Sequence, residues 1–274
     1  MNINRLFQVM KWNDIAQRKQ LFRVMIGLCV AYFIITGLSA GFFWKTGDLY
    51  EGKIEAAAVF CCMVTAGVLL FAASQICYNM KTKTDYINYA MIPATTLEKY
   101  ISNVLTVVIM HFVVAIVALL AADAMQYVVS YIRFDHAYSL THRVYNVIFH
   151  FNPSTQVDTQ IETTLWFGVV GIFLFIHSSF VMLGCLYRKH SFISSIMTWV
   201  VVPVSIVAIC FGFSNLIESI LVSNDSSLYV KPLFSDHVND ILGSILVYSL
   251  ISLCYYLGYR FFSRSQVINN RWIN

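Results

Sequence analysis

The deepest ionisable side chains in the apolar stretches of this sequence are two histidines. His111 and His177 each lie near the middle of a run that carries no Asp, Glu, Lys or Arg. Ionisable residues inside a membrane-crossing segment are functional candidates by default, because hydrocarbon disfavours charge. A proton relay would normally add a carboxylate at mid-depth, yet Glu55 and Asp123 fall near the ends of runs. The two histidines therefore either line a polar pathway or hydrogen-bond neighbouring helices while neutral. The second interpretation is favoured.

The sequence carries no motif for catalysis or for nucleotide binding. A glycine-rich phosphate loop with a lysine, an HExxH pair and a Gly-x-Ser-x-Gly elbow are all missing from it. His136, His142 and His150 are spaced by six and eight residues, which matches no compact metal-ligand motif. We therefore expect no catalytic residue, no metal site and no cofactor on this chain.

Composition indicates an all-α integral membrane protein. Only 12% of the 274 residues are charged, whereas soluble domains carry about 25%. About 20 apolar residues span a hydrocarbon core, and the apolar runs predict six spans. These lie at about 21–44, 54–78, 100–122, 164–187, 192–213 and 239–262. The seven cysteines all lie in these runs or at their ends, and we interpret them as small buried apolar residues.

Lysine and arginine indicate how the spans are oriented. With a cytoplasmic N-terminus, thirteen Lys and Arg fall in inner segments and five in outer ones. Inner loops carry the excess of these residues, so both termini are expected inside. The net charge of +4 is then a topology signal, and no nucleic-acid partner is expected.

A polar stretch, 79–100, separates the second and third spans. It holds three lysines, one proline and two helix-start signals. Pro93 ends any helix that arrives from the N-terminal side. Thr95 and Glu98 fit a capping box, so a helix restarts there. Thr84 or Asp85 can cap a short helix before the break. The stretch predicts a short surface helix, a proline break and then a span.

Three further segments complete the predicted layout. Residues 1–20 are expected to form an elbow helix on the membrane surface, amphipathic over 3–12, with a second capping box at Asp14 and Gln17 that restarts the chain. The outer segment 131–163 is expected to be surface loop. The outer segment 214–238 is apolar, and we expect it to lie on, or dip into, the outer leaflet.

This order of elements resembles the membrane subunit of an ATP-binding-cassette exporter of the type V fold. The polar stretch sharpens the resemblance, because Met91 to Lys99 is similar to the Leu-Pro-Ala-Ser-x-x-Glu-Lys signature found there in many such permeases, especially from Bacteroides-like bacteria. Ile92 stands for the leucine and Thr95 for the serine. The long outer segment after the third span departs from the family pattern.

The resemblance implies a function and a set of partners. The chain would be the permease half of an exporter in the bacterial cytoplasmic membrane, moving an amphipathic or hydrophobic substrate. A separate ATPase subunit would carry ATP and Mg²⁺ and dock on residues 81–99, and a second copy or a similar permease would complete the pathway. The implied docking residues are Lys81, Lys83, Asp85, Glu98 and Lys99 as charges and Tyr86, Ile87 and Tyr89 as apolar contacts, with Pro93 and Thr95 in the same loop.

Two other classes of protein remain open. The chain could be an assembly or regulatory membrane subunit that moves no substrate. It could also be a secondary transporter, which the lack of mid-membrane carboxylates and of an evident inverted repeat makes weaker.

Overall fold

The computed structural model describes residues 2–39, 50–80, 82–134, 139–149, 159–187, 190–221 and 236–267. Within these ranges the chain is helical, with no strand. This agrees with the all-α class that the composition predicts. The chain divides into two compact units, Met1–Trp166 and Phe167–Asn274.

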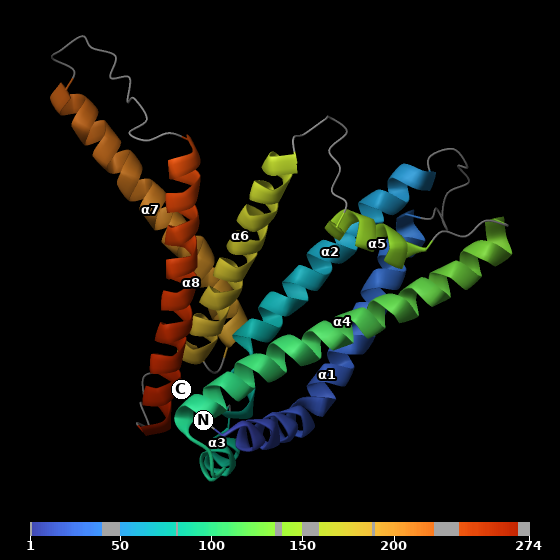
Figure 1. Cartoon of the computed structure of the whole chain (residues 1–274), viewed down its shortest axis with the longest axis horizontal. Helices are drawn as coiled ribbons and strands as arrows, with labels where there is room; N and C mark the ends of the chain where they lie inside the picture. The colour runs from blue at the N-terminus through green and yellow to red at the C-terminus, as the bar shows by residue number, and fades with distance from the viewer. Residues whose placement is uncertain are drawn as a thin grey trace. The chain divides into compact units, whose positions relative to one another are not determined.

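Unit 1 is built on three long helices with shorter elements at both of their ends (Figure 1). Two of the short elements precede α4, and the third follows it. In chain order the elements are α1 (Ile3–Ser39), α2 (Tyr50–Ser74), the 3-10 turn η1 (Tyr78–Met80), α3 (Lys83–Ala90), α4 (Thr96–Phe134) and α5 (Leu140–Phe149).

Helices α1 and α4 run parallel with a constant register. Asn13 Nδ2 donates to Ser102 Oγ at 3.1 Å, and Cys29 Sγ donates to the Ala118 carbonyl at 3.8 Å. Both pairs are 89 positions apart in sequence. Helix α2 runs antiparallel to them, as the 2.7 Å contact between the Tyr32 and Thr65 hydroxyls shows together with the direction of the ribbon (Figure 1).

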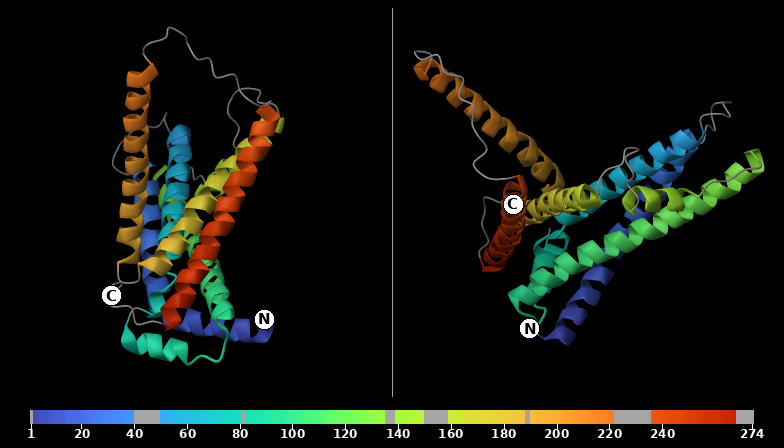
Figure 2. Two further views of the ribbon diagram at one scale, coloured as in Figure 1. Left: turned by 90° about the vertical axis from the view of Figure 1, so that its left-hand side faces the viewer. Right: turned by 45° about the horizontal axis from the view of Figure 1, so that its top comes forward.

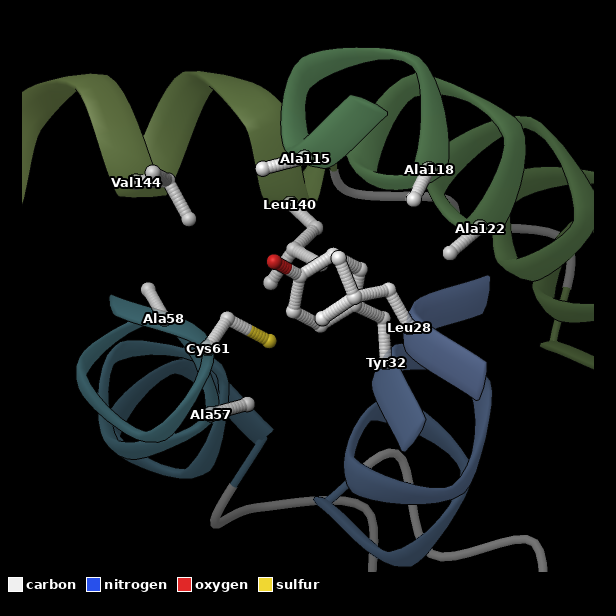
Figure 3. Packing of buried hydrophobic residues seen from close by; sticks show 10 residues of the cluster. All are labelled: Leu28, Tyr32, Ala57, Ala58, Cys61, Ala115, Ala118, Ala122, Leu140 and Val144. Atoms are coloured by element: carbon white, nitrogen blue, oxygen red, sulfur yellow. The ribbon is translucent and has the colours of Figure 1, made fainter. Parts of the chain in front are cut away.

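The apolar core of unit 1 joins α1, α2, α4 and α5. It places Leu28 and Tyr32 of α1 against small residues of α2 and α4, and α5 closes the cluster (Figure 3). The small side chains let the helix backbones approach closely, as in membrane helix pairs. The buried members are Leu28, Tyr32, Ala57, Ala58, Cys61, Ala115, Ala118, Ala122, Leu140 and Val144.

A carboxylate on α4 holds the first turn of α5. Asp123 accepts from the backbone N–H groups of Leu140 at 2.7 Å and Thr141 at 3.2 Å, and from the Ser139 hydroxyl at 2.8 Å. A helix N-terminus leaves such N–H groups unpaired and favours a nearby negative charge. Asp123 therefore anchors α5 to the bundle.

Unit 2 contains most of α6 (Thr159–Leu186) together with α7 (Ser191–Leu221) and α8 (Asp236–Val267). Trp199 Nε1 donates to Ser179 Oγ at 2.7 Å, and Phe180 packs on Phe192, so α6 and α7 form the antiparallel hairpin that the short connection predicts. Helix α8 runs parallel to α6. Gly171 of α6 lies beside Val247 of α8, since a Cβ on Gly171 would be 3.5 Å from the Val247 side chain. Further along both helices in the same direction, His177 of α6 contacts Tyr255 of α8.

Five described helices contain stretches long and apolar enough to cross a membrane: α1, α2, α4, α6 and α8. The fifth predicted span, 192–213, falls in α7, in which Ser191–Val207 forms a shorter apolar stretch. These helices indicate a multi-pass membrane protein. Several helices exceed the predicted spans. With 39 residues at about 1.5 Å each, α4 is about 58 Å long, and the hydrocarbon core is about 30 Å thick.

The structure differs from three local predictions. Helix α1 continues through Asp14, so no separate elbow helix forms, although its first part bends away from the rest (Figure 2). The helix continues because Asn13 is buried against Ser102, which packs both parts of α1 on α4. Helix α2 ends at Ser74, before the predicted 78.

The third difference concerns the outer segments. Helix α4 continues to Phe134 and α5 occupies 140–149, so much of 131–163 is helix and not loop. Helix α7 likewise continues to Leu221. Residues 222–235 of the 214–238 prediction lie outside the described residues, and 236–238 belong to α8.

Candidate functional site

The polar stretch that precedes α4 forms the end of unit 1. Helix α2 ends at Ser74, η1 follows, and α3 then lies across the end of the long helices (Figure 2). A turn over 91–95 leads into α4, and the Ala94 N–H donates to the Ile92 carbonyl at 2.8 Å around Pro93. The predicted order of short helix, break and long helix is confirmed.

The start of α3 lies two or three residues earlier than predicted. Thr82, and not Thr84 or Asp85, is the N-cap, and its hydroxyl accepts from the Asp85 N–H at 3.1 Å. The same hydroxyl donates to the Asp85 carboxylate at 2.6 Å. Threonine in extended geometry, three residues before an aspartate, satisfies the first N–H groups of a helix. Asp85 is exposed, and its carboxylate is hydrogen-bonded to the hydroxyl of the N-cap residue.

The capping box at the start of α4 is confirmed, and it has a further partner. The Glu98 N–H donates to Thr95 Oγ1 at 3.3 Å, and the Thr95 N–H donates to Glu98 Oε2 at 3.0 Å. The other carboxylate oxygen, Oε1, accepts from the Asn2 N–H at 2.8 Å. Glu98 is 2% exposed. One carboxylate thus joins the start of α1 to the start of α4.

Lys99 connects the end of α3 to the bundle. Its ammonium group donates to the Ala90 carbonyl at 3.0 Å and lies 5.5 Å from the centre of the Tyr89 ring. The Tyr89 hydroxyl donates to the Lys99 carbonyl at 3.2 Å, and the Tyr89 ring packs on Trp12 of α1 at 5.5 Å. Tyr89 and Lys99 are buried. This arrangement fixes α3 to both α1 and α4.

The predicted docking residues therefore divide into two sets. Tyr89, Glu98 and Lys99 point into the protein and hold the loop in place. Tyr86 is half-buried, and Ile87 is 52% exposed. Met91, which was not among the predicted docking residues, is a second large apolar side chain and is 76% exposed. Asp85, Pro93 and Thr95 are also exposed. Lys81 and the side chain of Lys83 lie outside the described residues.

Polar side chains are buried between the helices just beyond this loop. Asn13 Nδ2 donates to Ser102, and Asn79 Nδ2 donates to Asn13 Oδ1 at 2.9 Å, which ties α1, η1 and α4 together. His111 lies further along α4, 1% exposed, with Nδ1 2.9 Å from the Val107 carbonyl. The histidine therefore bonds its own helix.

His177 lies in unit 2 and contacts a different helix. Its Nδ1 is 3.1 Å from the Tyr255 hydroxyl of α8, and its ring packs near Phe173. The side chain is 6% exposed. The contact is of the kind that the packing interpretation predicts. The two histidines belong to separate units, and among the described residues no group of three or more His, Cys, Asp or Glu could hold a metal ion.

Sequence reasoning did not identify several residues that shape this end of unit 1. Asn2, Trp12 and Asn13 contact the loop and the first turns of α4 through the fold alone. A polar signal was present, because Asn13 and Gln17 are spaced by four residues, both are buried, and Asn13 meets Ser102 of α4. Searches against protein-family models, curated proteins and solved structures gave no match.

Proposed function

We propose that this chain is the membrane subunit of an ATP-driven exporter, and that a separate ATPase subunit docks on α3 and the turn that follows it. The observation that carries the proposal is the exposed short helix between two apolar helices, followed by a proline break and a capping box. This local arrangement is the one that the signature-like sequence from Met91 to Lys99 implies.

The exposed residues of the loop have the chemistry of a protein contact. Ile87 and Met91 are large apolar side chains on a polar loop, where water would otherwise surround them. Interface cores are enriched in methionine and aromatic residues and depleted in charge. Ile87, Met91 and the neighbouring Asp85 therefore form the proposed docking surface, with Lys81 and Lys83 beside it in sequence.

The buried residues of the loop supply a mechanical link. A push on α3 acts on α4 through the Lys99–Ala90 hydrogen bond and on α1 through the Tyr89–Trp12 contact. Because packed cores deform poorly, such a displacement moves helices as bodies. The proposed mechanism is that ATP-driven closure of the partner moves α3, and that α1 and α4 then open and close the pathway.

The remaining parts of the proposal concern assembly and placement. The chain lies in the bacterial cytoplasmic membrane with both termini inside, and the first part of α1 rests on the inner leaflet. Six spans form half of a pathway, so a second copy or a similar permease completes it. The substrate is an amphipathic or hydrophobic molecule. His111 and His177 are polar residues available to that pathway.

Affinity purification from native membranes tests the proposal. The tagged native chain is expected to bring down an ATP-binding-cassette ATPase. The double variant Ile87→Asp/Met91→Asp should lose it, because two charges replace the exposed apolar residues of the docking surface. Ile132→Asp is the matched control, since Ile132 is 78% exposed at the far end of α4.

The outcomes separate the classes of function. Recovery of the ATPase by the native chain and the Ile132→Asp control, but not by the double variant, supports docking at α3. If the double variant still brings down the ATPase, the ATPase docks elsewhere on the chain. If the native chain brings down no ATPase, the exporter proposal is wrong, and an assembly subunit or a secondary transporter becomes the better explanation.

A further inference from the structure

Five polar side chains between α1 and α4 contain buried atoms that have no hydrogen-bond partner among the described residues. We call Gln17, Gln20, Asn103, Thr106 and His111 the polar seam. The unpaired atoms are Gln17 Nε2, Gln20 Oε1, both amide atoms of Asn103, Thr106 Oγ1 and His111 Nε2.

The register of the two helices places Gln17 and Thr106 at the same level, with Gln20 and Asn103 next to them along their own helices. The Asn13–Ser102 and Cys29–Ala118 pairs share an offset of 89. The same offset places Gln17 level with Thr106, and each lies four residues beyond the bonded Asn13–Ser102 pair, so both are on the contact face. Gln20 is three residues from Gln17 on α1, and Asn103 is three residues from Thr106 on α4. Residues at this spacing are neighbours on the surface of a helix.

Thr106 differs from three other hydroxyl residues in the helices of this chain. Thr36, Thr65 and Ser195 each donate to the carbonyl four residues earlier, at 2.9, 2.7 and 2.6 Å. Helical Ser and Thr commonly satisfy their hydroxyls in this way. Thr106 does not, although it is 2% exposed. Its hydroxyl is free for another partner.

Exchanging the two amide atoms of Asn103 does not remove the deficit. Amide oxygen and nitrogen are assigned from their hydrogen bonds, so a single unpaired atom can reflect a flipped group. Both atoms of Asn103 are unpaired and the residue is 0% exposed, so either orientation leaves a donor and an acceptor unmet. Nearly all buried polar groups in proteins have a partner, either protein or ordered water.

The chemistry of the unpaired atoms selects the ligand. Gln17 Nε2 and Asn103 Nδ2 are donors, and Gln20 Oε1 and Asn103 Oδ1 are acceptors. His111 Nδ1 faces a carbonyl and so carries the proton, which makes Nε2 an acceptor. No member of the seam is an acid or a lysine or arginine. A neutral mixture of donors and acceptors suits water, which gives and takes hydrogen bonds and needs two to four polar partners.

We propose that the polar seam binds a cluster of water molecules inside unit 1. The cluster lies between the loop that precedes α4 and the apolar core, where Ala115, Ala118 and Ala122 continue the buried face of α4 without polar groups. Unit 1 is thus hydrated at its α3 end, and the stretch of α4 from Ala115 to Ala122 borders a dry core. This proposal does not depend on the transport function.

Cysteine labelling in native membranes tests the water cluster. Thr106→Cys and Asn103→Cys are treated with methyl methanethiosulfonate, a small neutral reagent that attacks the thiolate, and each cysteine is followed by peptide mass spectrometry. Because an apolar surrounding disfavours the thiolate and excludes the reagent, both introduced cysteines should react about tenfold faster or more than a thiol in the apolar core. Ala118→Cys is the matched control, and native Cys61, 1% exposed in the apolar core, is an internal one.

Each outcome decides the matter. Fast labelling at 103 and 106 with slow labelling at 118 and Cys61 supports the hydrated seam. Equal and slow labelling at all positions means that the seam is as dry as the apolar core, and the proposal is wrong. Equal and fast labelling at all positions means that unit 1 is open throughout, which also overturns a local water site. Thr106→Cys exchanges the hydroxyl for a thiol and removes one methyl group, which is a smaller change than Asn103→Cys, so its result stands if Asn103→Cys fails to fold.

Discussion

Glu98 receives backbone donors from two parts of the chain: Thr95, three positions away, and Asn2, 96 positions away in sequence. Its link to Thr95 is local, since a capping box depends on spacing within one helix turn, and the sequence predicts it correctly. The contact with Asn2 depends on α1 reaching the start of α4. The inward placement of Glu98, Lys99 and Tyr89 arises from this tertiary packing, which is why charge and polarity alone suggested exposed docking residues.

Removing the cap hydroxyl tests how the first turn of α4 is held. Thr95→Ala should cost about 1 kcal/mol of local stability, because the Glu98 N–H loses its acceptor. The first amides of α4 should then exchange hydrogen about fivefold faster, as measured by mass spectrometry. Thr96→Ala, one residue later and without that contact, is the control. Unchanged exchange in Thr95→Ala would mean that the Asn2–Glu98 bond alone secures the turn.

At the scale of elements, helix type and existence were largely predictable. The apolar runs identify the long helices because hydrocarbon imposes both length and composition on any span. Helix ends were less predictable, since α1 and α4 extend well past their apolar parts. Helix α5 was missed, although Leu140, Val144 and Val147 recur at helical spacing and pack on the core. The histidines and arginines around it suggested a loop.

Asp123 is expected to decide whether α5 stays packed. The two carboxylate oxygens of Asp123 accept from the N–H groups of Leu140 and Thr141. Asp123→Asn replaces one of these oxygens with an NH₂ group that cannot accept, at a cost of about 1–2 kcal/mol. Hydrogen exchange over Leu140–Phe149 should rise about tenfold while α4 stays protected. Glu55→Gln is the matched control, because it removes the exposed 3.4 Å ion pair with Arg143, which is expected to contribute well under 1 kcal/mol. Equal effects of the two variants would contradict the anchor.

At the scale of the whole molecule, the two units differ in what is buried at their helix contacts. Unit 1 combines a polar end, with Asn13, Asn79 and Ser102 bonded across three elements, and an apolar core of small residues. Unit 2 joins its helices through single aromatic and hydroxyl contacts such as Trp199–Ser179 and His177–Tyr255. Composition predicts neither pattern, because both depend on which helix faces meet.

Orientation is the property of the whole molecule that the sequence predicts most directly. Thirteen of 18 Lys and Arg lie in segments assigned to the inside, and these residues resist translocation, so both termini should be cytoplasmic. Green fluorescent protein fused after residue 274 should fluoresce, and alkaline phosphatase fused after residue 149, beyond α5, should be active. Phosphatase fused at residue 190, between α6 and α7, should be inactive. Active phosphatase at 190 with none at 149 would invert the topology and place α3 outside, where no ATP-driven partner could reach it.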